Sequence, residues 1–245
     1  MRRKFYKTAQ YFSNMKTVFL EAPYIGKVSL CKKTVDYLKK KKIKTVGLYA
    51  VIQFCHNLSN VRDQLQSLGI TVVTSQAKRT DASQQILGCD VYEDSLNLNE
   101  NELSLVDAFL YIGDGKFHPL ALLHGQKADV ICDDPLGKTM EVLDKSFIER
   151  ILKKQRGSLA TFYASDNIGV IITTKPGQQF MLKSFELEKK YPNKKFYYFL
   201  DDTISFGQLE NFPFIDVWVN TACPRIGLDD IEKFRKGVVN LRDVL

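Results

Sequence analysis

Short apolar runs alternate with amphipathic segments along the middle of the chain. Residues 44–54, KTVGLYAVIQF, are apolar enough to predict a buried strand and its exit loop. Residues 57–68 place apolar side chains at helical spacing before Gly69, and residues 70–75 predict a second strand. A further helix is expected over residues 29–41. Because a strand, a helix and a strand joined by short turns form a right-handed crossover, we expect a parallel sheet.

The same order of elements returns nearer the C-terminus. Residues 168–180 predict a strand and its exit loop, residues 181–190 a helix, and residues 195–200 another strand. A basic helix over residues 145–154 precedes them. This recurrence indicates two similar modules within one chain.

A second correspondence links the two halves. The stretch VDAFLYIGDGKFHPL, residues 106–120, stands in the first half where FIDVWVNTACPRIGL, residues 214–228, stands in the second. The loops at 113–115 and 221–223 are therefore expected to leave equivalent strands. We predict an α/β fold of two similar three-layer α/β/α modules with parallel sheets. The predicted division is a connecting segment at 1–43, a module at 44–164 and a module at 165–245.

The strand predicted at 214–219 leads directly to Cys223. Pro224 cannot donate to a sheet ladder, so the strand is expected to end there. Asp229 or Asp230 is expected to cap a helix over residues 231–239. This arrangement places a thiol at the carboxyl end of a strand, where open α/β sheets bind ligands.

Composition narrows the class of protein. The chain is 44% hydrophobic and 26% charged, which is typical of a globular protein, and no apolar run approaches a membrane span of roughly 20 residues. We therefore expect a cytoplasmic protein. The net charge of +7 favours an acidic partner, although runs such as KKKK at 39–42 are typical of solvated surface. Five scattered cysteines do not indicate a disulfide framework, so they are expected to be free thiols or ligands.

Two of the cysteines are candidates for chemistry. Cys89 follows Gly88, and glycine lets the backbone approach a cofactor closely, although a small buried hydrophobe is the commoner role for such a cysteine. Cys223 is equally consistent with a ligand or a reactive thiol. The two lie 134 positions apart (223 minus 89), which fits no zinc-finger spacing, so they can meet only between modules. The three cysteines expected to pack in the core are Cys31, Cys55 and Cys132.

Two loops could bind polar ligands. Gly113, Asp114 and Gly115 follow a predicted strand, so Asp114 could accept hydrogen bonds from a ligand, or the loop could be a tight turn with a capping aspartate. Residues 173–179, TTKPGQQ, would place backbone N–H groups at a helix start beside Lys175, which suits an anion, or they could be only a loop.

The motifs ILGCDV, YIGDGKFHPLAL and VNTACPRIGLDD, in that order, resemble the diphthamide synthesis family, the radical 2-(3-amino-3-carboxypropyl)histidine synthases. The resemblance covers residue 44 to the C-terminus. It implies three α/β domains around a 4Fe-4S cluster, each giving one cysteine, with Cys89 and Cys223 as two of the ligands. It further implies substrate-binding residues at Gly113, Asp114, Gly115, His118, Thr174, Lys175, Gly177, Gln178, Gln179 and Arg225.

The resemblance also implies a reaction and its partners. S-adenosylmethionine would be the cosubstrate, and its 3-amino-3-carboxypropyl group would pass to a histidine of translation elongation factor 2, with an external electron donor. The family's first domain and its cysteine have no counterpart in residues 1–43. We therefore expect a second chain, or a dimer, to complete the site. No membrane and no direct nucleic-acid partner is expected.

Two alternatives remain open. A non-catalytic subunit could bind the elongation factor or hold a cluster without cleaving S-adenosylmethionine. A quinolinate-synthase-like iron-sulfur enzyme would share the three-module plan, but its signature loops match less well.

Overall fold

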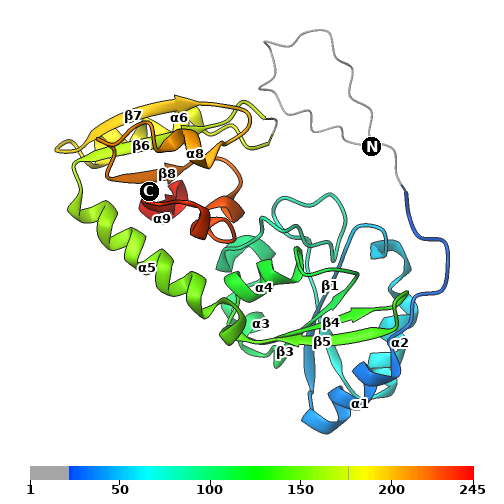
Figure 1. Ribbon diagram of the computed structural model, residues 1–245. Coiled ribbons are helices and arrows are strands. Elements are labelled where there is room, and N and C mark those ends of the chain that lie inside the picture. The colour runs from blue at the N-terminus through cyan, green and yellow to red at the C-terminus, as the bar shows by residue number, and fades with distance from the viewer. Residues whose placement is uncertain (1–21, 176) are drawn as a thin grey trace. The chain divides into compact units, whose positions relative to one another are not determined.

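The computed structural model describes residues 22–175 and 177–245 (Figure 1). By their internal contacts the described residues divide into an N-terminal unit, residues 22–148, and a C-terminal unit, residues 149–245. The predicted boundary lay at residue 164, after the helix that the structure groups with the C-terminal unit. That helix packs along the last strand of the C-terminal unit, which explains the grouping.

The N-terminal unit is built on one five-stranded sheet of order β2-β1-β3-β4-β5. Its elements are α1 (Lys32–Lys41), β1 (Thr45–Ala50), α2 (Ser59–Ser67), β2 (Thr71–Val73), α3 (Glu100–Ser104), β3 (Ala108–Ile112), α4 (Pro119–Gly125), β4 (Val130–Asp134) and β5 (Thr139–Leu143). Short 3-10 helices occupy Cys55–Asn57, Glu93–Leu96 and Lys145–Ile148.

The parallel sheet predicted here is confirmed for β2, β1, β3 and β4. The edge strand β5 is antiparallel, which was not predicted. Asp134 Oδ1 accepts hydrogen bonds of 2.9 Å from the amides of both Leu136 and Gly137, and this tight turn brings the chain straight back. An antiparallel neighbour needs only such a turn, so no crossover helix separates the two strands.

Helices cover the sheet of the N-terminal unit and bury its strands. Leu38 of α1 and Leu65 of α2 pack in one core with Leu48 and Leu110 of the central strands, and all four side chains are fully buried. The helix predicted at 57–68 is confirmed, and Gly69, at φ +72°, ends it. The α1 helix is shorter than predicted because it begins after Cys31.

The C-terminal unit has a four-stranded parallel sheet of order β7-β6-β8-β9. Its elements are α5 (Glu149–Ala164), β6 (Asn167–Ile172), α6 (Met181–Ser184), α7 (Glu186–Lys190), β7 (Lys195–Leu200), α8 (Phe206–Leu209), β8 (Val217–Asn220), β9 (Gly237–Asn240) and α9 (Leu241–Val244). Further 3-10 helices occupy Pro224–Gly227 and Ile231–Lys233.

The core of the C-terminal unit lies on both faces of its sheet. On one face, Phe162 of α5 and Leu187 of α7 pack with Val170 of β6. On the other face, Trp218 of β8 packs with Phe234. The three-layer prediction is therefore confirmed in this unit.

Two helix predictions in the C-terminal unit need correction. The helix predicted at 231–239 is wrong: only Ile231–Lys233 is helical, in one 3-10 turn, and neither predicted aspartate caps it through its side chain. The following residues form β9 because Val238 and Val239 fill the two faces of the sheet beside β8. The helix predicted at 181–190 is broken into α6 and α7 at Phe185.

The two units repeat one another in detail. Asp107 Oδ2 accepts hydrogen bonds from the amides of Lys44 (2.8 Å) and Thr45 (2.9 Å) at the start of β1. Asp216 Oδ2 accepts from the amide of Asn167 (3.0 Å) at the start of β6.

Glycines of the central strands show the same repeat. A Cβ on Gly47 of β1 would lie 2.5 Å from the Phe109 ring, and a Cβ on Gly169 of β6 would lie 2.4 Å from the Trp218 ring. The ladders pair these same residues. Position by position, β2, β1, β3 and β4 therefore correspond to β7, β6, β8 and β9.

Candidate functional site

Cys89 lies in a tight turn beyond the carboxyl end of β1. Ala50, the last residue of β1, bridges to Gln85, and the amide of Ile86 donates to the Ala50 carbonyl (3.2 Å). The chain thus passes the end of the sheet just before it reaches Cys89. The Cys89 side chain is half-buried, so part of it is accessible from outside the core.

Asp90 holds the turn that contains Cys89. Its Oδ2 accepts a hydrogen bond from the Leu87 amide (2.9 Å), and its own amide donates to the Leu87 carbonyl (3.0 Å). The residue is 1% exposed, and burial raises the pKa of its carboxyl. The sequence analysis did not single out Asp90, although an aspartate directly after the cysteine is a recognisable turn signal.

The glycine loop after β3 adjoins the Cys89 turn. A Cβ on Gly88 would lie 2.1 Å from the Phe117 ring, so glycine is what allows this ring to cover the turn. Phe117 in turn meets His118 edge to face, with ring centroids 5.4 Å apart. The structure therefore brings the Cys89 turn and the loop from Gly113 to His118 together within one unit.

The loop from Gly113 to His118, which leaves β3, has a backbone conformation that suits its glycines. Gly115 has φ +65°, a conformation that favours glycine. The buried Tyr111 hydroxyl donates to the Asp114 carbonyl (3.4 Å). His118 precedes α4, which begins at Pro119. The substrate-binding roles of Gly113, Asp114, Gly115 and His118 remain predictions.

Cys223 occupies the equivalent exit in the C-terminal unit. Thr221, at the end of β8, donates from both its amide (3.1 Å) and its hydroxyl (2.8 Å) to the Ile171 carbonyl of β6. The half-buried Cys223 precedes the 3-10 turn Pro224–Gly227, and the strand ends before Pro224 as expected. β3 and β8 occupy corresponding positions in the two sheets, which makes Asp114 the counterpart of Cys223.

Arg225 is not presented to solvent. Its side chain is 4% exposed, and its Nε donates to Asp229 Oδ2 (2.7 Å). Three amides after it, those of Leu228, Asp229 and Asp230, donate to its backbone carbonyl. In this conformation Arg225 supports the loop that carries Cys223, while its predicted contact with a substrate remains a prediction.

The loop predicted as an anion site differs from the expected geometry. No helix begins at residues 177–180, because α6 starts at Met181. The amide of Thr174 donates to Asp202 Oδ1 (3.1 Å), and its hydroxyl donates to the same carboxylate. These bonds hold the pKa of Asp202 below its ordinary value. The amide of Thr174 therefore binds the carboxylate of Asp202 and not an external anion. The contacts of Lys175 and Gly177–Gln179 with a ligand remain predictions.

The remaining cysteines differ from Cys89 and Cys223. Burial raises the pKa of Cys55 and of Cys132 to about 12, which disfavours the thiolate that binds metals. Cys31 Sγ lies 3.0 Å from Asp133 Oδ2, to which it donates. Cys55 is buried as predicted, whereas Cys31 and Cys132 are only partly buried.

Side chains that could bind a metal do not gather in one place within the part of the chain that the structure describes. Residues 22–175 and 177–245 contain no cluster of three or more histidine, cysteine or carboxylate side chains that could hold a metal ion. Cys89 and Cys223 belong to different units. Each thiol is partly exposed and lies on a loop that buried polar side chains hold in place. Each unit could therefore contribute one cysteine to a metal site, but within the described residues neither unit has enough donor side chains to form such a site by itself.

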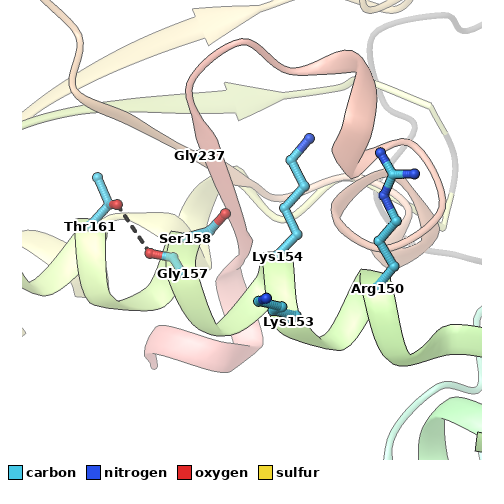
Figure 2. Close-up of a pocket in the computed structure, with 7 residues that line it drawn as sticks. All are labelled: Arg150, Lys153, Lys154, Gly157, Ser158, Thr161 and Gly237. Carbon is cyan, nitrogen blue, oxygen red and sulfur yellow. Dashed lines mark hydrogen bonds between the residues drawn. The ribbon is translucent and has the colours of Figure 1, made fainter. Parts of the chain in front are cut away.

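A shallow groove of about 520 Å³ follows α5 in the C-terminal unit (Figure 2). Its charged lining is entirely basic, and Figure 2 shows Arg150 and Lys154 on the same side of the helix. Arg150 is engaged with Glu232 at 2.6 Å. The groove is consistent with the acidic partner that the net charge favours, and that partner remains a prediction. The residues that line it are Arg150, Lys153, Lys154, Gly157, Ser158, Thr161 and Gly237.

None of the helices in the described residues has the length and hydropathy needed to cross a bilayer.

Comparison with known proteins places these features in a family. The family model of diphthamide synthesis proteins matches residues 7–244. The 2-(3-amino-3-carboxypropyl)histidine synthase of Pyrococcus horikoshii is 28% identical over 233 residues, which are 93% of this chain and 64% of that protein. Subunit 1 of the 2-(3-amino-3-carboxypropyl)histidine synthase of Aspergillus fumigatus is 28% identical over 192 residues, 76% of this chain and 40% of that protein.

Solved structures agree with the sequence comparison. The crystal structure of Dph2 from Pyrococcus horikoshii with a 4Fe-4S cluster matches with a TM-score of 0.64 and 27% identity, covering 84% of this chain and 59% of that one. The chain thus spans less than two thirds of the length of these relatives. The family resemblance and the α/β fold class predicted from the sequence are both confirmed. The chain belongs to the diphthamide synthesis family.

Proposed function

We propose that this chain contributes Cys89 and Cys223 as ligands of a 4Fe-4S cluster in an enzyme that carries out the first step of diphthamide synthesis. The observation that carries the proposal is that two partly exposed cysteines lie beyond the carboxyl ends of the interior strands β1 and β8 in a chain belonging to this family. Iron-sulfur clusters are held by thiolates, and three protein ligands leave one iron open. A related protein, Dph2 from Pyrococcus horikoshii, was crystallised with such a cluster.

The chemistry that such a cluster supplies when bound is one-electron reduction of S-adenosylmethionine. The 3-amino-3-carboxypropyl group released by that reduction would be transferred to a histidine of translation elongation factor 2. The chain's own residues would bind and orient the cosubstrate and limit access of water. Lys175 and the amides of residues 177–179 would bind its carboxylate.

A third thiolate is required and would come from outside the described residues. Cys31 and Cys55 were the alternatives within the chain, but they and Cys132 are unsuited to the role because burial disfavours their thiolates. A second polypeptide, or another copy of the chain, would provide the ligand. The external electron donor would act on the assembled site.

Iron analysis tests the ligand assignment. The chain is purified anaerobically after co-expression with a candidate protein that carries the family's first domain, and iron and sulfide are quantified. Cys89→Ala and Cys223→Ala should each lose most of the iron, whereas the matched variant Cys55→Ala should retain it. Full retention of iron in either of the first two variants would contradict the assignment.

A non-catalytic subunit is a second candidate. It would bind the elongation factor or hold a cluster without cleaving S-adenosylmethionine, and the basic lining of the groove along α5 suits an acidic partner. Cleavage of S-adenosylmethionine by the loaded assembly after anaerobic reduction separates the two. Cleavage supports a synthase, and iron binding without cleavage supports a scaffold.

A further inference from the structure

Two asparagines fill the interior of the turn that carries Cys223. Asn220 of β8 and Asn240 of β9 are ladder partners, and they are 1% and 3% exposed. Asn220 Nδ2 donates to Asn240 Oδ1 at 2.8 Å, so the two amides lie side by side. Buried side-chain amides are nearly always hydrogen-bonded. The partners of the other amide atoms therefore show which part of the chain the two asparagines bind.

Those remaining groups bind the backbone of the turn. Asn220 Nδ2 also donates to the Cys223 carbonyl (2.9 Å), and Asn220 Oδ1 accepts from the Ala222 amide (3.1 Å). Asn240 Nδ2 donates to the Pro224 carbonyl (3.0 Å). The backbone is therefore fixed immediately before Cys223, at Cys223 and immediately after it.

The end of the turn closes over the same pair. A Cβ added to Gly227 would lie 2.3 Å from Asn240 Oδ1, so only glycine leaves room for the amide. The 3-10 turn Pro224–Gly227 thus wraps around the two side chains.

The N-terminal unit also has a side chain at the position of Asn220 that donates to the loop after the strand. The register of the sheets makes Tyr111 the counterpart of Asn220 and Cys132 the counterpart of Asn240. Tyr111 donates to the carbonyl of Asp114, which is the counterpart of Cys223. A hydroxyl bond of 3.4 Å reaches that loop, whereas two side-chain amides make three bonds to the loop with the thiol.

We propose that Asn220 and Asn240 are positioning residues that hold the Cys223 thiol in the orientation in which it binds the cluster. This rests on the proposed function of Cys223 as a ligand. Metal ligands are commonly oriented by such outer-shell partners, because a ligand atom must be held in a fixed direction. The two asparagines bind the carbonyls of Cys223 and Pro224, and these bonds fix the backbone from which the Cys223 side chain projects.

Asn220→Asp tests the proposal, because the carboxylate has the same shape and keeps the acceptor for the Ala222 amide but cannot donate. The rate of alkylation of Cys223 by iodoacetamide in the metal-free chain is followed by peptide mass spectrometry, with Cys89 in the same sample as reference. We expect Cys223 to react about fivefold faster or more, the factor that corresponds to the loss of one ordinary hydrogen bond. The Cys89 rate should not change.

Gly227→Ala provides a second test that leaves both asparagines intact. Its Cβ must displace the Asn240 amide, so the Cys223 rate should again rise. Thr221→Val is the matched control, because it removes an equally buried hydrogen bond to Ile171 without touching the turn carbonyls, and it should leave the Cys223 rate at the wild-type value. Folding of each variant is checked by circular dichroism.

Iron occupancy of the co-expressed assembly supplies the second readout, and it should fall in Asn220→Asp and Gly227→Ala but not in Thr221→Val. Wild-type rates of Cys223 alkylation in both folded test variants would overturn the proposal. If the wild-type assembly binds no iron while Cys223 alkylation still responds to the variants, the proposed function fails but the asparagines are still established as the groups that hold this thiol.

Discussion

At the scale of single residues, buried polar side chains determine where the two candidate ligands lie. Asp90 closes the turn of Cys89 through two bonds with Leu87, and the asparagine pair closes the turn of Cys223. Both groups bind backbone atoms of nearby loops. Asp90 directly follows its cysteine and could have been recognised as a turn signal, whereas Asn240 acts on a carbonyl 16 positions earlier in the chain, which no residue spacing indicates. The motifs single out the two cysteines as candidates, but they do not reveal the contacts of the asparagine pair.

Asp133 provides a prediction at the same scale. It is fully buried, its Oδ2 accepts from the Cys31 amide at 3.0 Å, and its Oδ1 has no hydrogen-bond partner within the described residues. Burial raises the pKa of Asp133, so its folded value lies above its unfolded value. The stability that it contributes is therefore complete below the unfolded pKa and is lost as the pH rises through the folded pKa.

Asp133→Asn removes this titration while keeping an acceptor for Cys31. As the pH rises above about 4, the ordinary pKa of aspartate, and through the raised pKa of the folded state, the free energy of unfolding of the wild type should fall relative to the variant. Urea unfolding of both proteins across this range measures the difference. A difference that stays constant with pH would show that Asp133 does not titrate in the folded state as described.

At the scale of elements, the strands and helices with a clear period were the easiest to predict. The strand predicted at 195–200 coincides with β7, and the helix ended by Gly69 was found within two residues of its predicted bounds. The charged residues after Ile231 favour a helix locally, but residues 237–240 pair with β8 and form the strand β9. Tertiary pairing thus overrode local preference, and neither β5 nor β9 was predicted.

The close contact between Gly169 and Trp218 leads to a prediction about these elements. Gly169→Ala should destabilise the C-terminal unit by about 1–3 kcal/mol, because the added Cβ must push a ring that is 2% exposed. Gly157→Ala is the matched control: nothing lies within 4 Å of its Cβ, and alanine favours the helix by about 0.5–1 kcal/mol. Thermal unfolding of both variants measures the effects. Equal stability of the two variants would contradict the packing described for β6 and β8.

At the scale of the whole molecule, the chain is two copies of one plan. The three core clusters described above each draw their residues from a single unit. The sequence predicted the repeat from two corresponding stretches, and the register of the sheets supports it. Asp107 and Asp216 stand in similar local sequence, LVDAFL and FIDVWV, but the amides that they bind lie 63 and 49 positions earlier in the chain, so these contacts were not predicted.

Separate cores imply that damage to one should remain local. Leu110 and Val219 are fully buried at corresponding positions of the two units. Leu110→Ala should cost the N-terminal unit about 2–5 kcal/mol and speed hydrogen exchange in β1, β3 and β4. Exchange in β6–β9 should stay unchanged. Val219→Ala should give the reverse pattern, and faster exchange throughout the chain in either variant would contradict independent cores.

The bond from Tyr111 to Asp114 and the bond from Asn220 to Cys223 reach matching carbonyls from matching strand positions, yet a phenol makes one and a carboxamide makes the other. What the two halves hold in common is the strand position from which a polar side chain reaches the exit loop, while the residue that it reaches is an aspartate in one half and a cysteine in the other. The shared fold can therefore support different side chains, Asp114 and Cys223, at corresponding positions.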